Sequence, residues 1–109
     1  MFIRIYQINL DRDVERTAFE SLEWLERKTG RREVNCGLYE MVYEGDVACN
    51  GLEGVFRIFN MEHPTDYTAR SLSVSDIVEV VQDEKYERGF YFCDSFEFVK
   101  VEFHSEQAV

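Results

Sequence analysis

Proline and glycine are scarce in this chain, which has one proline and six glycines among 109 residues. This scarcity excludes the low-complexity and collagen-like classes. The chain also lacks an apolar run near the roughly 18–20 residues that a membrane span needs, and no hydrophobic signal segment follows Met1. We therefore expect a soluble protein of the cytoplasm with no membrane contact. Hydrophobic residues make up 45% of the sequence and aromatic residues 15%, which is enough for the core of one domain over residues 1–109.

Cysteine is limited to Cys36, Cys49 and Cys93, without the C-x-x-C spacing of redox or zinc motifs. A domain of this size does not need disulfides, so we interpret the three as reduced thiols that pack as small hydrophobic side chains. His63 and His104 lie far apart and have no spaced cysteine pair beside them. Glycine loops of the phosphate-binding type are also missing. The sequence thus predicts no metal and no cofactor.

Basic residues are fewer than acidic residues: the chain has 12 Lys and Arg and 22 Asp and Glu, which gives a formal net charge of −10. Residues 1–32 hold seven basic and six acidic side chains, residues 33–75 hold two and seven, and residues 76–109 hold three and nine. The acidic excess therefore belongs to the last two-thirds of the chain. Direct binding of nucleic acid is disfavoured, since Lys and Arg supply the phosphate contacts. A basic protein partner is favoured instead.

The first third of the chain predicts a strand followed by a helix. Residues 2–10 are rich in Phe, Ile and Tyr on both faces, which is typical of a central strand. A helix is predicted over residues 14–28, with Asp11 or Asp13 as N-cap and Gly30 just after its end. Its apolar stripe repeats at helical spacing and consists of Val14, Ala18, Leu22 and Leu25. Trp24 lies off this stripe, and we interpret it as part of the core rather than as an exposed anchor.

The remaining two-thirds predict four more strands and one helix. Alternation of apolar and polar residues over residues 38–47 favours a strand. Residues 52–60 are predicted to form a helix. Asn50 and Glu53 would be its capping box, and Asn60 would end it in a left-handed conformation. Strands are predicted over residues 77–81, 90–93 and 96–103, with a bend at Asp94 and Ser95. The order β-α-β-α-β-β-β indicates a single α+β domain with two helices and an antiparallel C-terminal sheet.

The densest polar segment lies between residues 63 and 76 and contains a histidine, three serines and two aspartates. A Ser-His-Asp triad is conceivable there, but none of the serines has the glycine-flanked turn of a nucleophile elbow. We therefore predict no catalytic residue and no enzyme. His63, held extended before Pro64, is interpreted as a loop histidine bonded to a backbone carbonyl.

The serines of this segment have a structural interpretation. Ser71 and Ser73 alternate with apolar residues, which is typical of the outward face of a strand, and Ser75-Asp76 is typical of a turn before the strand at 77. Arg70 is expected to pair with Asp66 or Asp76, and the alternative is that it binds a partner.

Several stretches resemble the YodL-like domain over nearly the whole chain. The most specific is the Ser-Leu-Ser-Val-Ser-Asp run at 71–76 together with Asp94-Ser95-Phe96; weaker similarity covers residues 5–8, 19–25, 43–47, 52–60 and 63–64. Glu97 departs from the pattern, which has a glycine there. The resemblance implies a cytoplasmic accessory protein of the kind found in Firmicutes and on conjugative and phage-like elements, acting through protein contacts. It supplies no catalytic residues.

An interaction surface is expected where the loop 61–71 meets the bend 93–96. Its candidate residues are His63, Tyr67, Arg70, Ser73, Ser75, Asp76, Asp94, Ser95 and Phe96. The partner would be a protein, with basic surface favoured by the charge of this chain.

Two other functions compete with this hypothesis. The first is an acidic DNA mimic of the antirestriction type, which needs a stripe of carboxylates such as Glu40, Glu44, Asp46, Asp83, Glu84 and Glu87. The second is a nucleic-acid-binding module similar to a PUA barrel, since residues 75–78 precede an aromatic hairpin; the acidic charge speaks against it.

Overall fold

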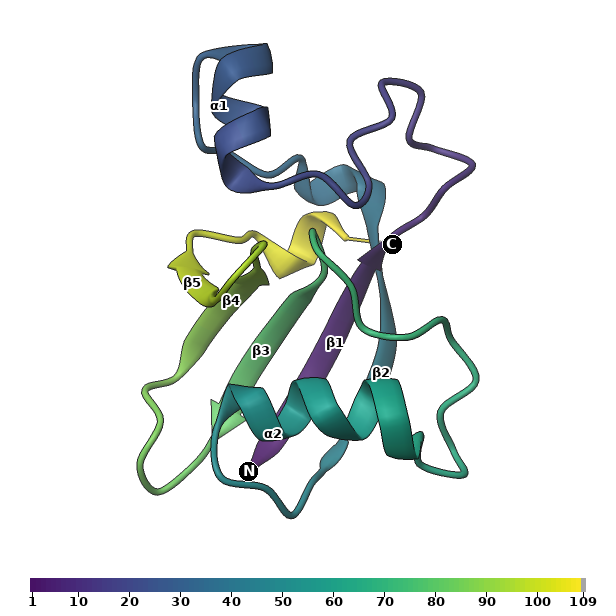
Figure 1. Cartoon of the computed structure of the whole chain (residues 1–109), viewed down its shortest axis with the longest axis vertical. Coiled ribbons are helices and arrows are strands. Elements are labelled where there is room, and N and C mark those ends of the chain that lie inside the picture. The colour runs from purple at the N-terminus through teal and green to yellow at the C-terminus, as the bar shows by residue number, and fades with distance from the viewer. Residues whose placement is uncertain (109) are drawn as a thin grey trace.

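The computed structural model describes residues 1–108 and contains one five-stranded antiparallel sheet in the order β2-β1-β3-β4-β5 (Figure 1). The strands are β1 (Phe2–Ile8), β2 (Tyr39–Asp46), β3 (Ile77–Gln82), β4 (Gly89–Cys93) and β5 (Phe98–Val101). The helices are α1 (Leu22–Thr29) and α2 (Leu52–Arg57), and α2 continues into a π-helical turn, Ile58–Glu62. Short 3₁₀ turns lie between α1 and β2, at Cys36–Leu38, and after β5, at Ser105–Gln107. The predicted α+β class and element order are confirmed.

The central position predicted for the first strand is also confirmed. β1 pairs antiparallel with β2 on one side and with β3 on the other. Successive side chains of a strand point to opposite faces, so Ile3 and Ile5 pack under α2 while Tyr6 and Ile8 pack on the other face. The predicted C-terminal sheet is present as the antiparallel ladders β3–β4 and β4–β5.

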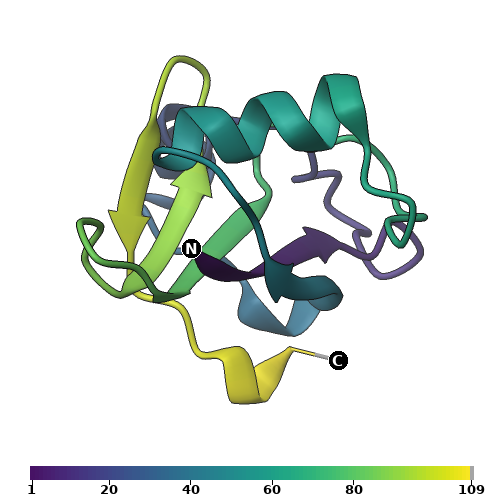
Figure 2. The ribbon, with the colours of Figure 1, turned by 90° about the horizontal axis from the view of Figure 1, so that it is seen from below.

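Two clusters of apolar side chains form the core, one on each face of the sheet. α2 lies across the first face, and the turns Cys36–Leu38 and Ser105–Gln107 lie across the second (Figure 2). Phe59 is fully buried in the first cluster, between the rings of Tyr43 and Tyr67. Phe92 is fully buried in the second, which α1 closes at the end of the sheet. Trp24 packs against this second cluster, as the core interpretation predicted.

The first helix is shorter than predicted, because residues 14–21 form turns instead. The Asp13 carboxylate accepts hydrogen bonds from Thr17 N, Thr17 Oγ1 and Ala18 N, each at 2.8 Å, and holds the chain in a local turn. Val14, expected in the apolar stripe, is 87% exposed. The N-cap is Ser21, whose hydroxyl accepts from Trp24 N at 3.1 Å. The predicted end at Gly30 is confirmed, with φ at +82°.

The predicted capping of the second helix is wrong at both ends. α2 begins after Gly51 and has no side-chain N-cap, so Asn50 and Glu53 do not form a capping box. Asn60 lies inside the π-helical turn, where its Nδ2 donates to Phe56 O at 2.9 Å. The strand interpretation of Ser71 and Ser73 is wrong as well, since this segment is a loop before β3.

Candidate functional site

The turn at Ser75 and Asp76 is joined to the end of β4, where the bend 93–96 begins. Ser75 N donates to Cys93 O at 2.9 Å, and Cys93 N donates to Asp76 O at 2.8 Å. The predicted turn at Ser75-Asp76 is present, closed by a hydrogen bond from Asp76 N to Ser73 O. Ser75 and Asp76, at the end of the loop that follows the π-helical turn, are therefore fastened to the end of β4, next to the bend at Asp94. The predicted meeting of residues 61–71 with the bend 93–96 stays a prediction.

Asp76 is the centre of a buried polar network at this junction. Its side chain is fully buried, and its Oδ2 accepts from Ser73 N at 2.8 Å and from Gln7 Nε2 at 3.0 Å. Burial raises the pKa of Asp76 to about 7, while the two hydrogen bonds and the charge of Arg70 limit the rise. Sequence reasoning missed Gln7, whose only signal is an amide among the apolar residues of a central strand.

Tyr67 and Arg70 extend this network toward β1. The Tyr67 hydroxyl donates to Arg70 O at 2.5 Å and accepts from Gln7 Nε2 at 3.3 Å. Arg70 Nη2 donates to Ile8 O at 2.9 Å, and the guanidinium lies over the Phe19 ring, 5.3 Å from its centroid. Arg70 thus bonds a main-chain carbonyl rather than Asp66 or Asp76, the partners that the sequence predicted.

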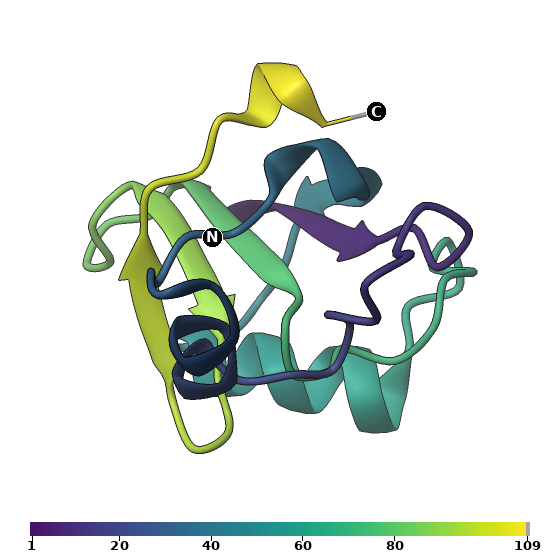
Figure 3. The same cartoon turned by 90° about the horizontal axis from the view of Figure 1, so that it is seen from above.

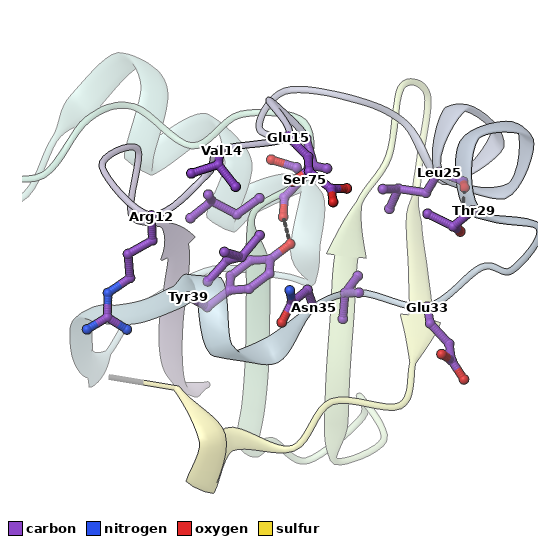
Figure 4. A pocket seen from close by; sticks show the side chains of 13 residues that line it. Arg12, Val14, Glu15, Leu25, Thr29, Glu33, Asn35, Tyr39 and Ser75 are labelled. Atoms are coloured by element: carbon purple, nitrogen blue, oxygen red, sulfur yellow. Dashed lines mark hydrogen bonds between the residues drawn. The ribbon is translucent and has the colours of Figure 1, made fainter.

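Ser75 connects three segments of the chain although its side chain is small. It has a left-handed backbone, with φ at +85°, and is buried. Its Oγ accepts from Phe19 N at 2.9 Å, and its carbonyl accepts from the Tyr39 hydroxyl at 2.6 Å (Figure 4). Tyr39 is a second network residue that sequence reasoning missed, because a tyrosine at the start of a strand is typical of the hydrophobic core.

The bend after β4 is tied to α1 and presents an aromatic side chain. Asp94 Oδ1 accepts from Leu22 N at 3.2 Å and from Ser95 N at 3.0 Å. Ser95 is exposed, and Phe96 is 100% exposed. Phe19, next to the anchored Leu22 segment, is 49% exposed. The candidate residues are thus divided: Tyr67, Ser75 and Asp76 are buried, whereas Ser95 and Phe96 on the bend are exposed.

His63 directly follows the π-helical turn and is exposed. Its Nε2 lies 3.1 Å from Ser71 Oγ, and its ring packs edge-on against Tyr67. The predicted backbone carbonyl is therefore replaced by a serine hydroxyl. Within residues 1–108, no hydrogen bond connects this Ser–His pair to a carboxylate, and Ser73 and Ser75 bond other partners.

A cavity of about 210 Å³ adjoins Ser75, which is one of its lining residues. Figure 4 shows Tyr39 and Ser75 next to each other among the lining residues, with Arg12, Val14 and Glu15 on the neighbouring loop. Leu25 and Thr29 of α1 line it as well. Its walls are mixed apolar and polar, and its presence was not predicted, because the loop that borders it was predicted to be helical.

The possible metal ligands and the three cysteines are the groups that metal or thiol chemistry would need. No three His, Cys, Asp or Glu side chains gather as metal ligands anywhere in residues 1–108. Cys36 and Cys93 are buried, Cys49 is half-buried, and all three are unpaired. Burial raises the pKa of the Cys93 thiol to about 12.

The carboxylates considered for a DNA-like stripe lie on β2 and on the turn between β3 and β4. Four of the six pair with cations: Glu44 with Arg4, Glu87 with Lys100, and Asp46 and Asp83 with the Met1 amine. Both nucleic-acid alternatives stay predictions.

Comparison with known proteins gives one match. The family model for the YodL-like domain matches residues 2–103, which is nearly the whole chain. No curated protein and no solved structure matches this chain. No helix within residues 1–108 has the length and apolar character to cross a membrane. The matched range includes all five strands, both helices and the polar network, and the chain therefore belongs to the YodL-like domain family.

Proposed function

We propose that this domain is a non-enzymatic interaction module that binds a basic protein partner through the surface around Phe96. The observation that carries the proposal is the complete exposure of Phe96 on an anchored turn. Exposed aromatic side chains lose apolar hydration when a partner covers them, and aromatic residues are frequent hot spots of protein interfaces. In Figure 3 the turn between β4 and β5 projects past α1, which makes it accessible to another protein.

The surroundings of Phe96 define the kind of partner. We use the name aromatic–acidic surface for Phe19, Glu20, Asp94, Phe96 and Glu97. The hydrogen bond from Leu22 N to Asp94 Oδ1 places the segment after Phe19 beside the bend. Three carboxylates thus accompany two exposed phenyl rings. A partner with an apolar pocket bordered by Lys or Arg would complement this surface, and the net charge of −10 would speed the encounter.

Rigidity supports the same proposal. Phe19 N is bonded to Ser75 Oγ, and Asp94 N donates to Glu97 O at 2.9 Å within the turn. Side chains held on fastened backbone lose less conformational entropy on binding than side chains on free loops. The cytoplasmic location and the association with a mobile element are parts of the proposal that the family resemblance supports.

Site-specific photo-crosslinking tests the proposal. A benzophenone amino acid replaces Phe96 in one variant and Met61 in a control, since Met61 is 79% exposed on a different part of the surface. We expect one protein with a basic surface to be crosslinked from position 96 and not from position 61. With that protein purified, Phe96→Ala should weaken binding by about tenfold or more, and Met61→Ala should not. Association should slow as salt rises.

Two outcomes would contradict the proposal. Equal crosslinking from both positions would show that Phe96 has no specific partner. Binding that DNA displaces and that survives Phe96→Ala would instead favour the DNA-mimic alternative.

A further inference from the structure

The two oxygens of the buried Asp76 carboxyl group have unequal surroundings. Oδ2 accepts two hydrogen bonds, from Ser73 N and Gln7 Nε2. Oδ1 has no partner, although it is buried. Among the residues that the structure describes, one other buried side-chain polar atom has no partner, and it is Arg70 Nε. An unsatisfied acceptor and an unsatisfied cationic donor therefore belong to one network.

Gln7 connects the two residues. Its Nε2 lies 3.0 Å from Asp76 Oδ2 and 3.0 Å from Arg70 O. The Arg70 guanidinium at present binds Ile8 O through Nη2 and covers the Phe19 ring, and its buried Nε–H has no acceptor.

The other titratable groups that face Asp76 stay uncharged near neutral pH. Tyr67 comes from the same loop, Tyr39 from β2 and Cys93 from β4. Burial raises the pKa of Tyr67 and of Cys93 to about 12, and it also raises the pKa of Tyr39. Arg70 is therefore the cation that can respond to a charge on Asp76.

We propose that Asp76 and Arg70 form a proton-controlled latch. In the neutral acid the Asp76 side chain carries no charge, and Arg70 keeps its contacts with Ile8 and Phe19. When Asp76 loses its proton to solvent, an anionic oxygen without a donor is left in the interior, which is strongly unfavourable. Arg70 then turns its Nε–H onto Oδ1 and leaves Phe19.

The latch lies directly beneath the aromatic–acidic surface. The Asp76 carboxylate accepts from Ser73 N and so positions the turn at Ser75. In that turn Ser75 Oγ accepts from Phe19 N, and Asp76 O accepts from Cys93 N. Release of Arg70 would uncover the face of the Phe19 ring that the guanidinium now covers, and Phe19 is one of the two exposed rings of this surface. This effect on binding rests on the proposed function, whereas the latch itself does not need a partner.

Nuclear magnetic resonance on the intact domain tests the latch without any partner. The Asp76 Cγ shift and the Arg70 Nε–Hε signals are followed from about pH 5 to about pH 9. We expect both to change together with a midpoint near 7, the pKa that burial produces for Asp76. The Arg70 Hε signal should move downfield at high pH, as a charge-assisted hydrogen bond requires. A midpoint near the ordinary value of about 4, or an Arg70 signal that stays constant, overturns the proposal.

Variants separate the latch from a general pH effect. Asp76→Asn keeps an oxygen for Ser73 N and Gln7 and should make the Arg70 signals independent of pH. Asp66→Asn removes an exposed carboxylate of the same loop and should leave the transition intact. Arg70→Gln removes the cation and should raise the Asp76 midpoint by about one pH unit. A transition that survives in Asp76→Asn would refute the assignment, and the wild-type titration decides the matter if that variant fails to fold.

Discussion

Ser75 offers a way to measure how much backbone strain this fold stores at its central junction. The residue is buried with φ at +85°, a conformation that side chains with a Cβ rarely adopt. Its hydroxyl also accepts the Phe19 N–H at 2.9 Å. Alanine and glycine at this position both remove the hydroxyl, but only glycine relieves the left-handed backbone.

The expected magnitudes follow from these two contributions. Ser75→Ala loses one hydrogen bond, worth about 1 kcal/mol, and keeps the strain. Ser75→Gly loses the same bond but regains about 1–2 kcal/mol of left-handed strain. Glycine also adds about 0.5–1 kcal/mol of conformational entropy to the unfolded chain. We therefore expect Ser75→Ala to be the less stable variant by about 0.5–1 kcal/mol, with Ser75→Gly close to the wild type.

Urea unfolding followed by the fluorescence of Trp24, the single tryptophan, gives both free energies. Ser95 supplies the matched control, because it is an exposed serine that is not among the positive-φ residues. There glycine should be less stable than alanine, since only the unfolded-state entropy differs. If Ser75→Gly is as destabilised as Ser75→Ala, or more so, the argument for strain at Ser75 is refuted.

Three further changes test other parts of the structure. Phe59→Ala should lower the free energy of unfolding by about 3–5 kcal/mol in urea, because it empties a fully buried site between two aromatic rings; a loss below about 1 kcal/mol would contradict that packing. Ser21→Ala should cost about 1 kcal/mol in the same assay through loss of the α1 N-cap, and no change would mean that α1 does not need it. The neutral form of Asp76 should stabilise the fold below the unfolded pKa of about 4, and this stability is lost as pH rises through about 7. Relative to Asp76→Asn, the wild type should therefore lose about 2–3 kcal/mol between about pH 5 and pH 8, and parallel pH profiles of the two would exclude the shifted pKa.

The strands were predictable because their signal is local. Val78 and Val80, like Ile3 and Ile5, belong to short β-branched runs that form strands wherever a face can be buried. Gly30 marked the end of α1 for a similar reason, since the left-handed position after a helix favours glycine. The helical period at Val14 and Ala18 was misleading, because the carboxylate of Asp13 binds the following backbone and stops the helix from starting there.

The network around Asp76 was predictable only in part. Ser75-Asp76 could be identified as a turn from its own residue types, and the family resemblance pointed to residues 71–76 and 94–96. Gln7 could not be identified, because it lies 69 residues from Asp76 in the chain and meets it only when β1 and β3 pair.

By itself, the amino-acid sequence determined the element order, the central place of β1, the acidic excess and the family, since each depends on local pattern or composition. The tertiary structure alone decided which polar residues are buried and which are accessible. Asp76 and Phe96 show the difference: a carboxylate is buried because a turn, a strand and an arginine surround it, whereas a phenyl ring is exposed because its turn projects beyond α1. Burial is a property of long-range packing, and it moves the pKa of one residue and makes the other available to a partner.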